Sequence, residues 1–116
     1  MTKKKTTAAA SLGSATTTSQ TTIAVAPGSI TPTMIVVQYS TPAGNQPKTF
    51  GQWIGLWQGP LASYTVPPVT SVQVTTNNSQ GTVAVPVTLL RSTTYSVGYV
   101  MGPQQTTLAA TFTFTT

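Results

Sequence analysis

The chain has 116 residues, five basic side chains and a formal net charge of +5. It contains no aspartate, glutamate, histidine or cysteine. Without carboxylate, imidazole or thiolate side chains, it cannot build a catalytic triad, a disulfide or a common metal site. The length suits one small domain with a modest core. We therefore predict a protein with no catalytic activity, no cofactor and no bound metal.

The first twenty residues differ in composition from the rest of the chain. They hold Lys3, Lys4 and Lys5, followed mainly by alanine, serine and threonine. A segment with so few large apolar side chains cannot form a core. We predict an extended basic arm over residues 1–20 and a folded domain over residues 21–116.

Targeting signals are weak in this sequence. The apolar run after the lysines, residues 8–12, is too short for a signal peptide. No apolar run approaches the roughly 20 residues that span a bilayer, so we expect no membrane span. The sequence leaves the compartment open, and an extracellular or virion assembly is compatible with it.

Strand-forming residues dominate the remainder, and about a fifth of the chain is threonine. Turn residues such as Pro27, Gly28 and the 77–81 stretch NNSQG separate the apolar runs. No segment keeps a helical period over three turns. The expected strands are, in chain order, 21–25, 33–40, 50–58, 71–76, 81–90, 93–100 and 107–116. Seven or eight short strands with regular turns predict an antiparallel β-sandwich.

Two of these segments show a clear two-residue period. The return strand 81–90 places its apolar side chains on one face, and its Pro86 cannot donate to a ladder, so this strand is at a sheet edge or carries a bulge. The last strand alternates apolar residues with threonine. The residues expected to share the core face of these two strands are Val83, Val85, Val87, Leu89, Leu108, Ala110, Phe112 and Phe114.

The segment LLRSTTYSVGYV carries a resemblance to known families. Its Leu89, Thr93 and Tyr95 resemble the E–F corner of fibronectin type III and immunoglobulin-like domains. WIGLW is similar to a Trp-Ile-Gly-Leu-Tyr strand in some immunoglobulin-like modules attached to phosphatases, which usually carry an aspartate where Gln52 stands here. The resemblance covers about residues 30–115 and implies an immunoglobulin or fibronectin III-like sandwich, in which the tyrosine hydroxyl bonds back to the chain. It implies no particular activity.

The stretch TFGQWIGLWQGP, residues 49–60, carries apolar bulk on both faces of its expected strand. Trp53, Gly55 and Trp57 point one way, and Ile54 and Leu56 the other. Either set can fill the core, or neighbours can cover both. A flat sugar-stacking platform is an alternative, but sugar sites usually add hydrogen-bonding carboxylates beside the ring. We favour a packing role and expect a second copy of the protein to cover the outer face.

The charge pattern bears on partners. Three lysines in the arm would give a weak, salt-sensitive contact with phosphates, and no aromatic residue is interleaved to stack on bases. We therefore expect no nucleic-acid partner. A surface of threonine, serine, asparagine and glutamine lacks the charge repulsion that keeps copies apart.

These observations favour a self-assembling structural protein, a homo-oligomeric subunit of a filament, shell or matrix that associates through its arm and strand edges. Two alternatives stay open at this stage. One is a carbohydrate or surface-recognition module that uses Trp53 and Trp57. The other is a virion coat or decoration protein with a basic arm.

Overall fold

The part of the chain that the structure describes is built mainly from strands. The structure, a computed structural model, describes residues 20–26, 28–63 and 65–116. Within these ranges no helix is long and apolar enough to cross a membrane. The described residues form β1 (Thr22–Val25), β2 (Met34–Ser40), β3 (Trp53–Gln58), β4 (Thr70–Gln73), β5 (Gln80–Pro86), β6 (Thr94–Val100), the short 3-10 helix η1 (Gln105–Thr107) and β7 (Leu108–Thr115).

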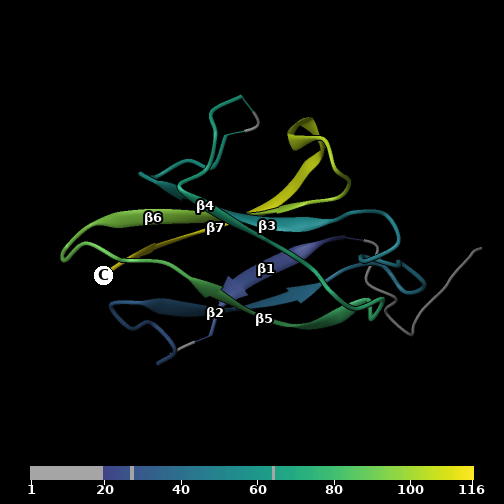
Figure 1. The fold of residues 1–116 in the computed structure, drawn as a ribbon, viewed down its shortest axis with the longest axis horizontal. Coiled ribbons are helices and arrows are strands. Elements are labelled where there is room, and N and C mark those ends of the chain that lie inside the picture. Colours follow the sequence, from purple (N-terminus) through teal and green to yellow (C-terminus); the bar gives the residue numbers. More distant parts are fainter. Residues whose placement is uncertain (1–19, 27, 64) are drawn as a thin grey trace, which may run out of the picture.

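The seven strands form two sheets that face each other (Figure 1). The first sheet has the order β1-β2-β5 and the second the order β4-β3-β6-β7. All neighbouring strands in both sheets are antiparallel. The prediction of an all-β antiparallel sandwich is confirmed. Strands β1, β5, β4 and β7 are the four sheet edges, and β3 and β6 lie in the middle of the second sheet.

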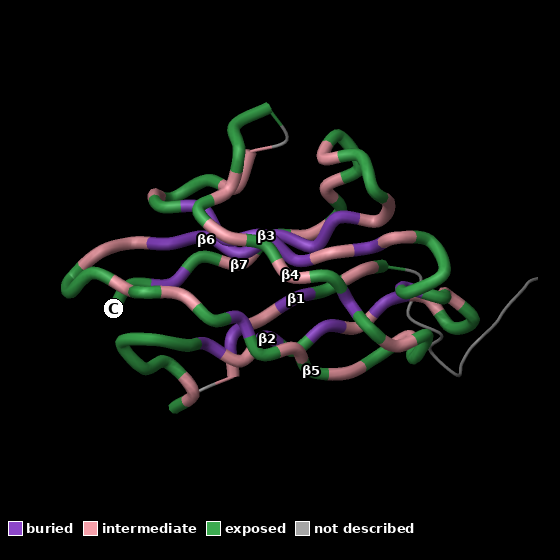
Figure 2. Tube along the Cα trace, in the orientation of Figure 1, coloured by how far each residue is buried: buried purple, intermediate pink, exposed green. Residues whose placement is uncertain are grey.

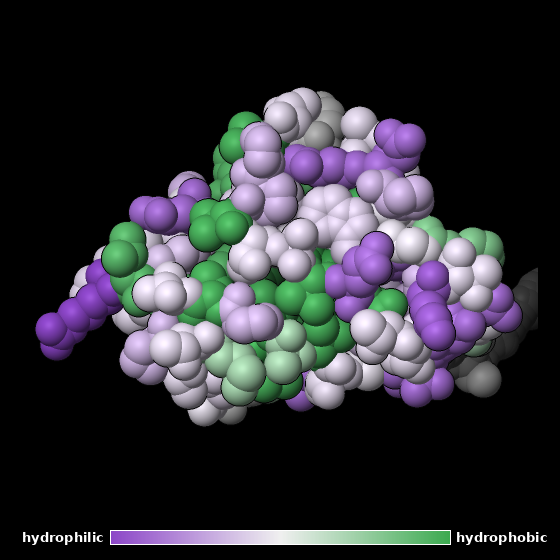
Figure 3. All heavy atoms as spheres, viewed as in Figure 1, coloured by the Kyte–Doolittle hydropathy of each residue, from purple (hydrophilic) through white to green (hydrophobic). Residues whose placement is uncertain are grey.

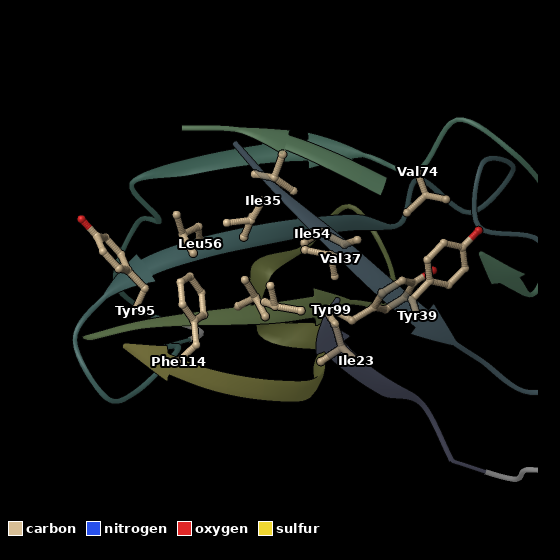
Figure 4. Close-up of a cluster of buried hydrophobic side chains, with 13 residues drawn as sticks. Ile23, Ile35, Val37, Tyr39, Ile54, Leu56, Val74, Tyr95, Tyr99 and Phe114 are labelled. Atoms are coloured by element: carbon tan, nitrogen blue, oxygen red, sulfur yellow. The ribbon is translucent and has the colours of Figure 1, made fainter. Parts of the chain in front are cut away.

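Apolar side chains from both sheets fill the space between them (Figure 4). Tyr39 and Tyr99 meet there with ring centroids 5.5 Å apart, and Tyr95 and Phe114 with centroids 5.8 Å apart. Such pairs contribute stability beyond the area that they bury. The aliphatic core residues with no exposed surface are Ile35, Val37, Val85, Ile54, Leu56 and Val97.

Strand β5 confirms the prediction made from Pro86. It pairs only with β2, so it is a sheet edge. The Val87 N–H donates to the Thr33 carbonyl on the β2 side at 3.0 Å. Because backbone groups alternate in direction along a strand, the nitrogen of Pro86 points away from β2, where the missing N–H breaks no ladder bond.

Strand β7 corrects one expectation. Ala110, Phe112 and Phe114 pack on the core as predicted, but Leu108 does not share their face. The pairing of β6 with β7 shifts register between Tyr99 and Val100. This bulge reverses the alternation and places Leu108 on the outer face of the second sheet.

Strand β3 is shorter than expected at its start. The predicted strand 50–58 begins only at Trp53. Before it, the chain turns through Gly51, which has a positive φ of 68°, and the Gln52 N–H donates to the Pro47 carbonyl at 2.9 Å. Phe50 is 54 % exposed, so it contributes to a loop surface and not to the core.

The chain enters and leaves the sandwich at opposite ends. The Thr21 hydroxyl donates to the Met101 sulfur at 3.5 Å, just beyond the last residue of β6. The Thr116 N–H donates to the Thr93 carbonyl at 3.0 Å, just before the first residue of β6. Because β6 runs along the sandwich between these two contacts, residues 21 and 116 lie far apart along its strands.

Candidate functional site on the outer face of the second sheet

The two faces of β3 have different neighbours. Ile54 and Leu56 point into the core and have no exposed surface. Trp53, Gly55 and Trp57 therefore lie on the outer face of the second sheet. Trp57 is nevertheless only 3 % exposed, and Trp53 is half-buried. Something in the same chain must cover this face.

The cover is the connection from β3 to β4, residues 59–63 and 65–69, which we call the β3–β4 loop. It stands above the outer face in Figure 1 and lies over buried segments of β3 and β6 in Figure 2. The Trp57 indole N–H donates to the Val66 carbonyl at 2.7 Å. The expectation that a second copy covers this face is therefore wrong for Trp57, because its own loop buries it.

Two glycines let the indole rings lie close to the sheet. Gly55 and Gly98 are directly opposite each other on β3 and β6. A Cβ on Gly55 would lie 2.8 Å from Trp57 Cζ3 and 2.9 Å from Trp53 Cζ3. A Cβ on Gly98 would lie 2.6 Å from Leu108 Cδ1 and 3.0 Å from Trp57 Cζ3. The rings and Leu108 occupy the space that larger residues would fill, so Gly55 has a packing role.

Polar bonds hold the β3–β4 loop against the sheet and against the segment 101–107. The Gln105 side-chain amide donates to the carbonyls of Ser63 at 2.9 Å and Val66 at 2.6 Å. The Ser63 hydroxyl accepts from the Val66 N–H at 3.2 Å. At the start of the loop, the Ser96 hydroxyl donates to the Gly59 carbonyl at 2.9 Å. These bonds satisfy loop backbone groups on the inner side.

The outer side of the β3–β4 loop is apolar. Leu61, Val69 and Val66 are 78 %, 58 % and 54 % exposed, and Figure 3 shows hydrophobic surface on this loop at the top of the view. The described residues enclose no pocket. With Trp57 covered, Trp53 and Trp57 do not form the open sugar-stacking platform that the sequence left as an alternative.

The corner before β6 has the predicted bond. Tyr95 is 2 % exposed, and its hydroxyl accepts from the Leu90 N–H at 2.8 Å. Leu89 packs against the core, and the Thr93 hydroxyl donates to the Arg91 carbonyl at 2.9 Å. These residues fix the path of the chain between the sheets and present no free chemical group.

A buried polar cluster at one end of the sandwich was not predicted. The Tyr99 hydroxyl donates to Gln52 Oε1 at 2.6 Å, Gln52 Nε2 donates to Asn45 Oδ1 at 2.8 Å, and Asn45 Nδ2 donates to the Thr41 hydroxyl at 2.9 Å. Burial raises the pKa of the Tyr99 hydroxyl above its ordinary value, and nearby Tyr39 raises this pKa further. The members satisfy one another, so the cluster holds loops together and leaves no group free for chemistry.

The cluster had one signal in the sequence. Gln52 is a polar residue directly before the apolar WIGLW segment, at the position where the modules that this segment resembles usually carry an aspartate. The sequence does not indicate which residues its side chain bonds. Its partner Asn45 lies in the loop before it, and Tyr99 follows it by 47 positions. No local pattern connects residues so far apart.

Charged side chains are absent from the seven described strands. The two charged residues in the described part, Lys48 and Arg91, are exposed and lie in loops. Lys3, Lys4 and Lys5 of the predicted arm lie outside the described residues. Because the whole sequence contains no acidic residue, no side-chain ion pair can form.

The sheet edges and the Trp53–Trp57 face are thus the two surfaces from which a function can be argued. The sheet edges carry no charge, and the edge strands β1 and β7 of the two sheets lie beside each other. The Trp53–Trp57 face is largely covered by the chain itself. Comparison of the chain with protein-family models, with curated proteins and with solved structures found no match.

Proposed function

We propose that the chain is a fibronectin III-like or immunoglobulin-like module with no catalytic activity. The buried corner tyrosine supports this assignment, because its hydroxyl bonds back to the chain at the expected place. The fourth strand favours the fibronectin type III form. It pairs with β3 in the second sheet, whereas constant-type immunoglobulin domains place their fourth strand beside the strand equivalent to β5.

We further propose that this module is a self-associating structural subunit of a filament, shell or matrix. The observation that supports this function is the lack of charge on all four edge strands. An edge strand offers unpaired backbone donors and acceptors, and folded proteins usually guard such edges with lysine, glutamate, proline or bulges. In this protein, the features that hinder pairing at an edge are Pro86 on β5 and the bulge at the start of β7.

The rest of the surface agrees with self-association. The described part adds little electrostatic repulsion where its strand edges would meet, because its only charged side chains are Lys48 and Arg91, both in loops. Recognition of a carbohydrate through Trp53 and Trp57 loses its support, since Trp57 is 3 % exposed. Association through backbone groups and uncharged side chains should also depend little on salt.

Sedimentation velocity over a wide range of concentrations tests this function. We expect larger species to grow with concentration, at both low and high salt, and electron microscopy of the concentrated sample should show regular assemblies. The matched control is a triple variant, Ser71→Lys, Thr82→Lys and Thr111→Lys, which places one exposed charge on three of the edges. It should stay monomeric. A parent protein that is monomeric at every concentration would refute the proposal.

A further inference from the structure

We propose that the free edge of β7 pairs antiparallel with β7 of a second copy, so that two second sheets join into one continuous sheet. This inference rests on the self-association proposed above and names the surface and the partner. It follows from the direction of backbone groups along β7, from a comparison of the four edges, and from the side chains that the pairing brings together.

The first step is the direction of the backbone groups of β7. The Thr116 N–H donates to the Thr93 carbonyl, so the backbone groups of residue 116 point toward β6. In an antiparallel ladder, bonded and non-bonded pairs alternate, so the backbone groups of Phe114, Phe112 and Ala110 also point toward β6. The N–H and carbonyl groups of Thr111, Thr113 and Thr115 then point away from the sheet. Their side chains are exposed.

The second step compares β7 with the other edges. β1 and β4 have four residues each, which gives a short ladder. β5 has seven residues, but Pro86 lies at its end with its nitrogen on the free side. β7 has eight residues, with no proline and no charge. Its bulge lies at the start of the strand and leaves the part after Ala109 regular. β7 is therefore the longest edge strand, and after Ala109 it has no proline, no charge and no bulge to hinder pairing.

The third step is the fit of one β7 to another. A two-fold axis at Phe112 places Thr111 opposite Thr113 of the second copy and Thr113 opposite its Thr111. Each of these pairs can exchange both N–H···O bonds. Phe112, which is only partly buried on the core side, then lies opposite Phe112 of the second copy in a non-bonded pair, where side chains come closest. The threonines form an uncharged ladder on the other face.

The test is a proline at an outward-facing N–H. Thr111→Pro removes a donor that the monomer does not use, and the side chain of Thr111 lies exposed on the outer face. The matched control, Thr82→Pro, makes the same change on β5, where residue 82 also faces outward. By sedimentation equilibrium, we expect Thr111→Pro to raise the dissociation constant of the dimer at least about tenfold. Thr82→Pro should leave this constant within about twofold of that of the parent.

The outcomes separate the two proposals. If Thr82→Pro weakens the dimer and Thr111→Pro does not, or if neither does, the β7 pairing is wrong while self-association stands. A parent protein that never associates refutes both. Should Thr111→Pro fail to fold, the double variant Thr111→Lys/Thr113→Lys replaces it. That variant sets lysines directly opposite lysines across the proposed axis, which disfavours pairing, so an unchanged dimer would overturn the inference.

One further variant separates a second copy of β7 from the predicted arm as the occupant of this edge. Deletion of residues 2–19 should leave the dimer intact if β7 pairs with β7. Loss of the dimer on this deletion would identify the arm as the pairing segment and would overturn the inference.

Discussion

Tyr95 ties the corner between β5 and β6 to the core through one ring and one hydrogen bond. The ring stacks beside Phe114 with centroids 5.8 Å apart, and the hydroxyl accepts from the Leu90 N–H at 2.8 Å. The next turn includes Ser92, which adopts a left-handed backbone with φ of 51°. A non-glycine residue seldom adopts this conformation, so the tyrosine helps to hold a turn that the sequence alone does not favour.

Tyr95→Phe should destabilise the fold by about 1 to 2 kcal/mol, because the Leu90 N–H loses its acceptor while the ring stays in place. Urea unfolding followed by fluorescence measures this difference. The control is Tyr39→Phe, whose hydroxyl donates to the carbonyl of Asn78 at 3.0 Å. A carbonyl that loses one donor costs less than an N–H that loses its acceptor, so a smaller loss is expected. An unchanged midpoint for Tyr95→Phe would show that the corner bond contributes nothing.

At the scale of the elements, the sequence predicted the strands well, because alternation is a local signal. The face of β5 that carries Val85 followed from this alternation, and the edge position of β5 followed from Pro86, which cannot donate to a ladder. The face of β3 could not be chosen, since Trp57 and Leu56 give apolar bulk on both sides. Local periodicity does not say which side a distant segment covers.

The β3–β4 loop shows what was missed at this scale. Residues 59–69 contain prolines and small residues, which predict a loop but not its position. The loop lies over the second sheet because of bonds from residues far along the chain, including Ser96 and Gln105. In contrast, the corner of Tyr95 was predictable, because its residues lie within six positions and match a known pattern.

Gln105→Ala should loosen the β3–β4 loop without unfolding the sandwich. The side-chain amide of Gln105 bonds two carbonyls of the loop, and the core lies on the other side of the sheet. Hydrogen exchange by mass spectrometry should show faster exchange in residues 60–69 and unchanged exchange in β6. Gln104→Ala is the control, because that neighbouring side chain is exposed. Equal exchange in both variants would contradict the anchoring role of Gln105.

At the scale of the whole molecule, the lack of acidic residues and histidine controls the response to pH. Acid unfolding of most proteins reflects carboxylates that take up protons or buried histidines that become charged. The sequence has neither. The buried groups that titrate in this protein are instead tyrosines, which lose their protons only at high pH. Desolvation raises the pKa of Tyr39 and Tyr99 above the ordinary value of 10.0.

The free energy of unfolding should therefore be flat from about pH 3 to pH 9 and fall above about pH 10. Above that pH the unfolded chain releases the tyrosine protons while the folded chain keeps them, so stability is lost as the pH rises. The slope is at most about 1.4 kcal/mol per pH unit for each tyrosine. Urea midpoints measured across this range test the expectation. A steep loss between pH 6 and pH 3 would contradict it.

The placement of residues 21 and 116 at opposite ends of β6 has a mechanical consequence. A pulling force applied through these two points acts along β1 and β7. Ladder bonds are perpendicular to their strands, so this force loads them in shear, and the bonds of a strand must break together instead of one after another. β1 has only four residues and should slip first. Under tension, the domain should therefore lengthen in a short first step as β1 detaches, while the strands of the second sheet stay paired.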